Sequence, residues 1–100
     1  MATTSKALFR GAASTSNTTL YTVPSATTTV VTNIVVTNTA SSAATFDLSL
    51  DDVKTAQGVS VAANSITVID LKQVLATTKT IKGLASATTV NFHISGVEIA

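Results

Sequence analysis

The chain has no cysteine and no tryptophan, and its 100 residues include only one histidine, one proline and four aromatic residues. Without cysteine it has no disulfide framework and no cysteine zinc site. A single histidine excludes a histidine cluster. No apolar run approaches the roughly 18 residues that a membrane-spanning helix needs. These absences remove several classes of binding and catalytic protein before any pattern is considered.

Charge is also scarce, because six basic and five acidic residues give a net charge of +1. A soluble chain of this length usually carries roughly 25 charged residues. The weak and balanced charge gives no footprint for nucleic acid or for an anionic membrane. A net charge near zero favours association. We therefore expect much of the surface to be covered by copies of the chain or by a partner.

Residues with β-branched side chains are abundant: threonine, valine and isoleucine make up 38 of the 100 residues. Such residues favour sheet, and the length fits one small domain. Alternation of apolar and polar residues predicts seven or eight short strands separated by turns. This pattern predicts an all-β fold, an antiparallel β-sandwich of the jelly-roll or immunoglobulin-like type, with a small barrel as the alternative. The expected strands cover residues 20–23, 27–37, 45–50, 59–61, 65–71, 80–85 and 89–99.

Three local features modify this pattern. Residues 72–76 (KQVLA) predict a single helical turn. Gly96 interrupts the alternation of the last strand, which predicts a β-bulge there. Asp51 and Asp52 open a predicted loop that runs to Gly58.

Residues 1–18 are small and polar, apart from an apolar island, and we predict an N-terminal arm there, with one sandwich domain over residues 19–100. Fully extended, such an arm would reach about 60 Å and could grip a neighbouring subunit. The expected partner contacts are Leu8, Phe9 and Arg10 in the arm and Tyr21 beyond it. No apolar stretch typical of a secretory signal follows Lys6 or Arg10, so we expect assembly inside the producing cell.

Catalytic and metal chemistry have few candidates. His93 is the only potential histidine base, and Ser95 lies on the same strand face about 6.6 Å away, too far for a direct hydrogen bond. We therefore place His93 on an outer sheet face or in an interface. Asp47, Asp51 and Asp52 cluster near one strand end but lack the spacing of a calcium loop. We expect no catalytic residue, no cofactor and no metal site, so the chain is not expected to be an enzyme.

Several stretches carry a family resemblance: residues 20–24 (LYTVP), 30–39 (VVTNIVVTNT), 43–46 (AATF), 62–65 (AANS), 69–75 (IDLKQVL) and 90–99 (VNFHISGVEI). With these the chain resembles small β-rich virion structural proteins of tailed bacteriophages, cyanophages included. The resemblance implies a β-sandwich subunit that is present in many copies. It carries no catalytic residues.

Together, these observations predict a non-enzymatic bacteriophage virion protein that decorates or cements the capsid shell. A tail, neck or baseplate and fibre subunit is the first alternative, and a host-surface binding module is the second. The expected partners are other copies, as a homotrimer or ring, and the major capsid protein or tail proteins, with no nucleic acid and no membrane. The expected location is the virion, after assembly in the host cytoplasm.

Overall fold

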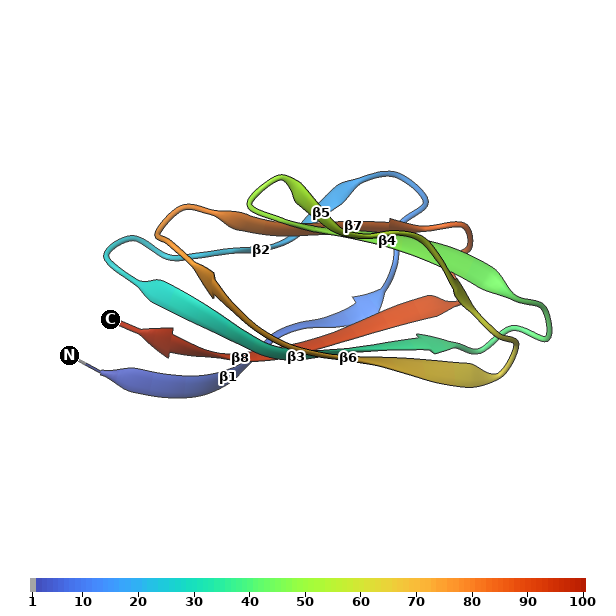
Figure 1. Cartoon of the computed structure of the whole chain (residues 1–100), viewed down its shortest axis with the longest axis horizontal. Helices are drawn as coiled ribbons and strands as arrows, with labels where there is room; N and C mark the ends of the chain where they lie inside the picture. Colours follow the sequence, from blue (N-terminus) through green and yellow to red (C-terminus); the bar gives the residue numbers. More distant parts are fainter. Residues whose placement is uncertain (1) are drawn as a thin grey trace.

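The computed structural model describes residues 2–100, which form two layers of antiparallel strands (Figure 1). No helix among these residues is long and apolar enough to span a membrane. The strands are β1 (Thr3–Ala12), β2 (Thr18–Thr22), β3 (Thr28–Asn38), β4 (Ala44–Leu50), β5 (Val53–Val61), β6 (Ser65–Leu75), β7 (Thr80–Ala85) and β8 (Val90–Ile99).

The strands pair in a nested order, β1 with β8, β2 with β7, β3 with β6 and β4 with β5. The chain is thus one long hairpin, folded so that the pairs alternate between two sheets. Sheet A has the order β1-β8-β3-β6, and sheet B has the order β2-β7-β4-β5. Eight strands in two sheets with this nesting form a jelly roll. The predicted sandwich is confirmed, and the pairing selects the jelly roll over the immunoglobulin-like alternative.

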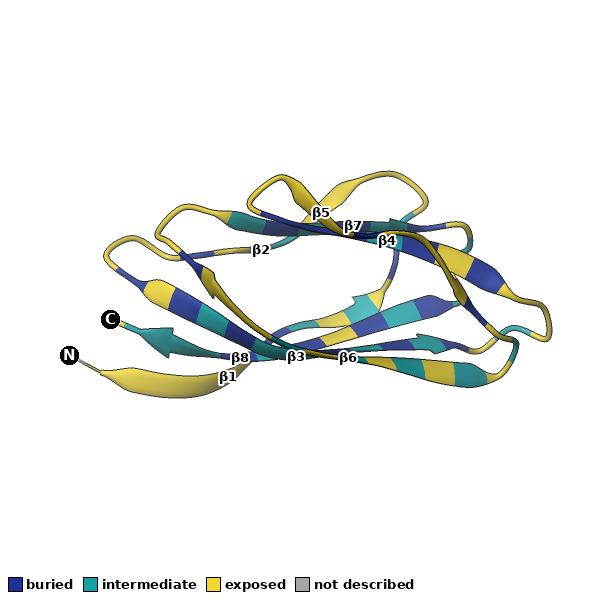
Figure 2. Ribbon diagram, in the orientation of Figure 1, coloured by how far each residue is buried: buried dark blue, intermediate teal, exposed yellow. Residues whose placement is uncertain are grey.

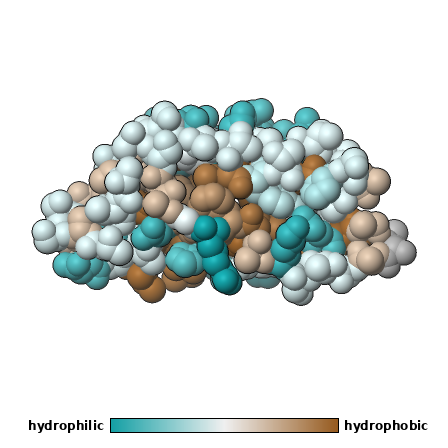
Figure 3. Space-filling view, turned by 180° about the vertical axis from the view of Figure 1, so that it is seen from behind, coloured by the Kyte–Doolittle hydropathy of each residue, from teal (hydrophilic) through white to brown (hydrophobic). Residues whose placement is uncertain are grey.

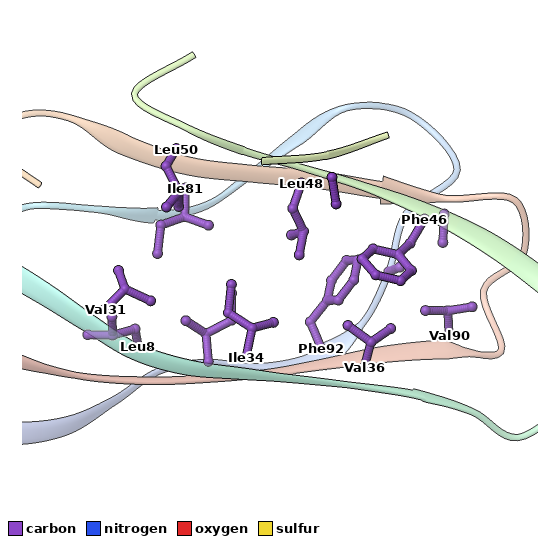
Figure 4. Packing of buried hydrophobic residues seen from close by; sticks show 14 of the residues in the cluster. Leu8, Val31, Ile34, Val36, Phe46, Leu48, Leu50, Ile81, Val90 and Phe92 are labelled. Atoms are coloured by element: carbon purple, nitrogen blue, oxygen red, sulfur yellow. The ribbon is translucent and has the colours of Figure 1, made fainter. Parts of the chain in front are cut away.

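The core lies between the sheets, because alternate residues of each strand point inward (Figure 2). Phe46 of β4 and Phe92 of β8 meet edge to face, with ring centroids 6.0 Å apart and an interplanar angle of 71° (Figure 4). Aromatic pairs favour this geometry because the positive ring edge faces the negative ring face. The largest aliphatic side chains around them are fully buried: Ile34, Leu48, Ile81 and Ile94.

The N-terminal segment differs from the predicted arm. Residues 3–12 form the edge strand β1, which pairs with β8 along its whole length; residue 1 lies outside the described residues. Leu8 is only 7% exposed and Ala13 only 2%, so both belong to the core. The apolar island that seemed to interrupt a polar arm is the part of β1 that faces sheet B. Residue 18 is the first residue of β2, not a domain boundary.

The helical turn predicted at residues 72–76 is absent, because β6 continues as a strand to Leu75. Val74 and Leu75 are in register with Val30 and Thr29 of β3. Leu75 is 2% exposed and completes the core at this end of the sheet. Pairing with β3 therefore outweighs the local helical propensity of this short segment.

The bulge predicted at Gly96 is also wrong in its position. In β8 the alternation is unbroken, since Glu98 rather than Val97 continues the inward face and bonds to Tyr21 from sheet B. The register shifts lie instead in β1 and β3, the two strands that flank Gly96. A Cβ atom at Gly96 would lie 2.5 Å from the carbonyl oxygen of Val30. Glycine is therefore required for close strand approach.

The loop predicted from Asp51 to Gly58 is a tight turn followed by strand β5. Asp51 and Asp52 have φ values of 54° and 59°, and they alone connect β4 to β5. Two successive positive φ values indicate a type I′ hairpin turn. Gly58, with a φ of 58°, lies within β5, where its amide nitrogen donates to the Asp47 carboxylate at 2.8 Å.

Candidate interaction surface

The outer face of sheet A is defined by the registers of its four strands. Arg10 of β1, His93 of β8, Val35 of β3 and Val68 of β6 form one row across the sheet. Directly paired residues of neighbouring strands point to the same face. His93 pairs with both Arg10 and Val35, and Arg10, His93 and Val68 are exposed while Val35 is half-buried. The row therefore changes from cationic and polar at β1 to aliphatic at β6.

A shallow trough of about 530 Å³ lies on this face. Arg10, His93 and Ser95 line it on the β1–β8 side, Asn33, Val35 and Thr37 of β3 line its middle, and Ile66 of β6 lines its far side. Figure 3 shows brown apolar side chains at the lower margin of the molecule, where sheet A lies, and others between the two layers.

Strand β6 supplies most of the exposed apolar area of this face. Ile66 is 63% exposed, Val68 is 58% exposed and Val74 is 68% exposed. Ile66 and Val68 are adjacent outward positions of this edge strand and form one apolar patch, whereas the exposed pair Asp70–Lys72 separates Val74 from them. This clustering marks the outer face of sheet A as the candidate interaction surface.

The distribution of ion pairs singles out Arg10. Every carboxylate among residues 2–100 lies within 4.0 Å of a lysine, and each of the five lysines has its own acidic partner. Arg10 is the only charged side chain in this part of the chain without an ion-pair partner. The pairs are Lys6–Glu98, Lys54–Asp47, Lys72–Asp70, Lys79–Asp51 and Lys82–Asp52.

Of the four expected partner contacts, the structure exposes one fully on the candidate surface and packs the other three against or into the core. Arg10 is exposed and lies in the trough. Leu8 is a core residue, Phe9 packs against the core, and Tyr21 is half-buried between the sheets. Leu8 is therefore not available as a surface anchor, and Phe9 and Tyr21 are only partly exposed, because β1 and β2 use these side chains to close the sandwich.

Sequence reasoning missed the aliphatic side of the surface. The segment 65–71 is apolar on both faces, with Ile66 and Val68 on one and Ile69 and Leu71 on the other. That pattern is typical of a strand covered on both sides. In the structure β6 is an edge strand, and one of those apolar faces remains uncovered.

No protein-family model matches the chain, and no curated protein is detectably similar to it. The surface is therefore interpreted from its own residues.

His93 and Ser95 both point outward from β8, in adjacent rows of sheet A. No hydrogen bond joins their side chains among the described residues. The carboxylates Asp47, Asp51 and Asp52, which the sequence places near one strand end, each pair with a different lysine. Within residues 2–100 no three metal-ligating side chains lie close enough to hold an ion.

A polar network connects the two sheets beneath this surface. The Tyr21 hydroxyl donates to Glu98 at 2.5 Å, and its oxygen lies 2.8 Å from the Thr29 hydroxyl, which is left to donate. Lys6 donates to the same carboxylate at 3.4 Å. Burial, and then the bond to Glu98, raise the pKa of Tyr21 to about 12. The Tyr21 and Lys6 hydrogen bonds hold the pKa of Glu98 below its usual value, although burial opposes them.

Proposed function

We propose that this protein is a non-enzymatic structural subunit of a bacteriophage virion, which decorates or cements the capsid shell. The observation that carries the proposal is the eight-stranded jelly roll, an architecture common among capsid and lectin domains. The resemblance of its strand sequences to small tailed-phage virion proteins supports the same role. In this proposal, binding only to the assembled shell stabilises the shell by mass action.

The surface chemistry favours binding over catalysis. The trough is shallow, and its one histidine and one serine are not hydrogen-bonded to each other. Nucleophilic and acid–base mechanisms need such groups within direct reach. The aliphatic side chains of β6 instead provide area that a partner can cover. We assign the contact with the particle to the outer face of sheet A.

A lectin-like host-recognition module is the second jelly-roll role. The residues that line the trough include no phenylalanine, tyrosine or tryptophan on which a sugar could stack, so the shell-binding role fits this surface better. A tail or neck subunit would use the same kind of binding surface as a capsid subunit, but it would bind at a different place on the particle.

Quantitative mass spectrometry of purified particles from the phage that encodes the chain tests the proposal. The expected result is many copies per particle, in a fixed ratio to the major capsid protein. A fixed ratio to a tail protein would move the subunit to the tail. Its absence from particles that are otherwise complete would contradict the virion role.

A further inference from the structure

The outer face of sheet A presents one charge that the chain itself does not neutralise. Arg10 is the only lysine or arginine among residues 2–100 with no carboxylate within 4.0 Å. It is exposed on β1, in register with His93, which adds a ring N–H donor beside it. A guanidinium presents its N–H groups in a flat fork that matches the two oxygens of a carboxylate.

Val68 of β6 lies at the margin of the trough, in the same row of sheet A as this cation and at a fixed distance from it. Three strand spacings separate Arg10 on β1 from Val68 on β6, which is about 14 Å at 4.8 Å for each spacing. A small anion would reach only the cationic side. An extended peptide lying across the strands places residues i and i+4 on the same side about 13 Å apart. It could therefore contact Arg10 and Val68 together, with residue i+2 between His93 and Val35.

We infer that this trough binds an extended segment of another protein, which carries a carboxylate side chain followed by two aliphatic side chains at alternate positions. The carboxylate pairs with Arg10, and the aliphatic side chains cover Val35, Ile66 and Val68. The inference rests on the proposed assembly role for the partner to be a protein of the particle.

A second copy of the chain fits this surface less well. All five of its carboxylates are already paired with lysines, so docking one on Arg10 would cost an existing ion pair. An acidic sugar would supply a carboxylate but would leave the exposed Ile66 and Val68 without apolar contact.

The test uses two five-residue peptides, Ac-Glu-Ser-Val-Ser-Val-NH2 and its neutral counterpart with Gln in place of Glu. Each is titrated into the isotope-labelled chain and followed by NMR. His93 is the only histidine, so its ring protons give one resolved reporter inside the trough. We expect saturable shifts at His93, Val35 and Val68, at least about tenfold weaker binding of the Gln peptide, and no shifts at Val53 on sheet B.

Two variants that each remove one positive charge distinguish a specific contact at Arg10 from nonspecific electrostatic attraction of the acidic peptide. Arg10→Gln is expected to weaken binding of the Glu peptide at least about tenfold. Lys79→Gln removes the same charge from a turn that leads into β7, and is expected to change affinity less than twofold. Val68→Thr keeps the shape of an exposed side chain and is expected to weaken both peptides severalfold.

Four results would overturn the inference, and three of them concern the peptides, the variants and the protein concentration. They are a Glu peptide that shifts none of the trough residues, equal binding by the Arg10→Gln variant, and shifts of the trough residues that depend on protein concentration alone, which would show a second copy on this face. Glucuronate that binds as tightly as the Glu peptide would also overturn it, in favour of a sugar site. If the chain binds the peptide but is absent from virions, this inference stands and the proposed virion role is wrong. If the chain is present in virions but does not bind the peptide, the virion role stands and this inference is wrong.

Discussion

Tyr21 and Glu98 connect the two sheets through a part-buried hydrogen bond between a hydroxyl and a carboxylate. Replacing Tyr21 with Phe leaves Glu98 with Lys6 alone and leaves the Thr29 hydroxyl without its acceptor. We expect a loss of about 1–3 kcal/mol in the free energy of unfolding at pH 7. Urea denaturation measures this loss. An unchanged unfolding midpoint would contradict the structural role of this network.

The same pair predicts how stability depends on pH. The pKa of Tyr21 rises from 10.0 to about 12, so above pH 10 the unfolded chain loses a proton that the folded chain keeps. The contribution of Tyr21 is therefore complete below pH 10 and is lost as the pH rises through 12. The lowered pKa of Glu98 has the opposite sign, and its contribution is lost as the pH falls below the usual value of 4.5.

Urea midpoints measured from pH 7 to pH 12 check the alkaline arm of this dependence. Tyr21 is the only tyrosine, so phenolate absorbance follows its ionisation directly. The Tyr21→Phe variant is expected to lose less stability than the parent between pH 10 and pH 12, and lysine ionisation affects both chains alike. Parallel stability curves for the two chains would refute the assignment.

Asn38 plays a similar part at the other end of the sandwich. Its side-chain nitrogen donates to the carbonyl oxygens of Ser42 at 2.9 Å and Val61 at 3.3 Å. Its oxygen accepts from the amide nitrogen of Ala40 at 3.0 Å and from the Thr89 hydroxyl at 3.2 Å. Since Asn38 is 2% exposed, Asn38→Ala should leave buried groups unpaired and cost about 2–4 kcal/mol.

Thermal or urea unfolding measures the effect of Asn38→Ala. Asn91→Ala is the matched control, because Asn91 is a half-buried residue of the outward row of β8. The control is expected to change stability by no more than about 0.5 kcal/mol. Equal losses in the two variants would contradict the role given to Asn38.

At the scale of elements, deletion of β1 tests whether this segment is a dispensable arm or an integral edge strand. Deletion of residues 2–12 removes Leu8 from the core and leaves β8 without one of its two neighbours. We expect the truncated chain to be strongly destabilised or unfolded, since core truncation alone costs about 2–5 kcal/mol. Circular dichroism and thermal unfolding measure this. A truncated chain with an unchanged midpoint would restore the arm that the sequence predicts.

Strand content was predictable because alternation in segments such as 45–50 is a local property. Most of the strand pairing was not, because every nested pair except the β4–β5 hairpin joins residues far apart in the chain, as Thr3 and Ile99 illustrate. The same limit explains the error at Gly96, where apolar Val97 and Ile99 face outward and the inward position belongs to Glu98. Without its Tyr21 partner in view, a carboxylate gives no signal of an inward position.

The candidate surface was predictable only at Arg10 and His93. The neighbours of Arg10 in the trough come from β3, β6 and β8, so the group exists only once the register is known. His93 was correctly placed on the face of β8 opposite Phe92. The aliphatic side of the surface was missed because an apolar outward face has the same sequence pattern as a buried one.

At the scale of the whole molecule, the sparse and nearly balanced charge favours association between copies. Light scattering behind a sizing column measures the mass of the protein in solution. We expect a discrete oligomer, a trimer or a ring, held by surfaces other than the trough. A stable monomer at high concentration would contradict self-association and would leave a subunit that assembles only on a preformed shell.

The central claim is that this jelly roll is a structural subunit that binds an assembled particle. Co-sedimentation with particles that lack the protein tests it most directly, with Arg10→Gln and Lys79→Gln as paired variants. We predict saturable binding at a fixed number of sites, loss of binding for Arg10→Gln and retention for Lys79→Gln. Folded protein that stays in the supernatant at all concentrations would contradict the claim.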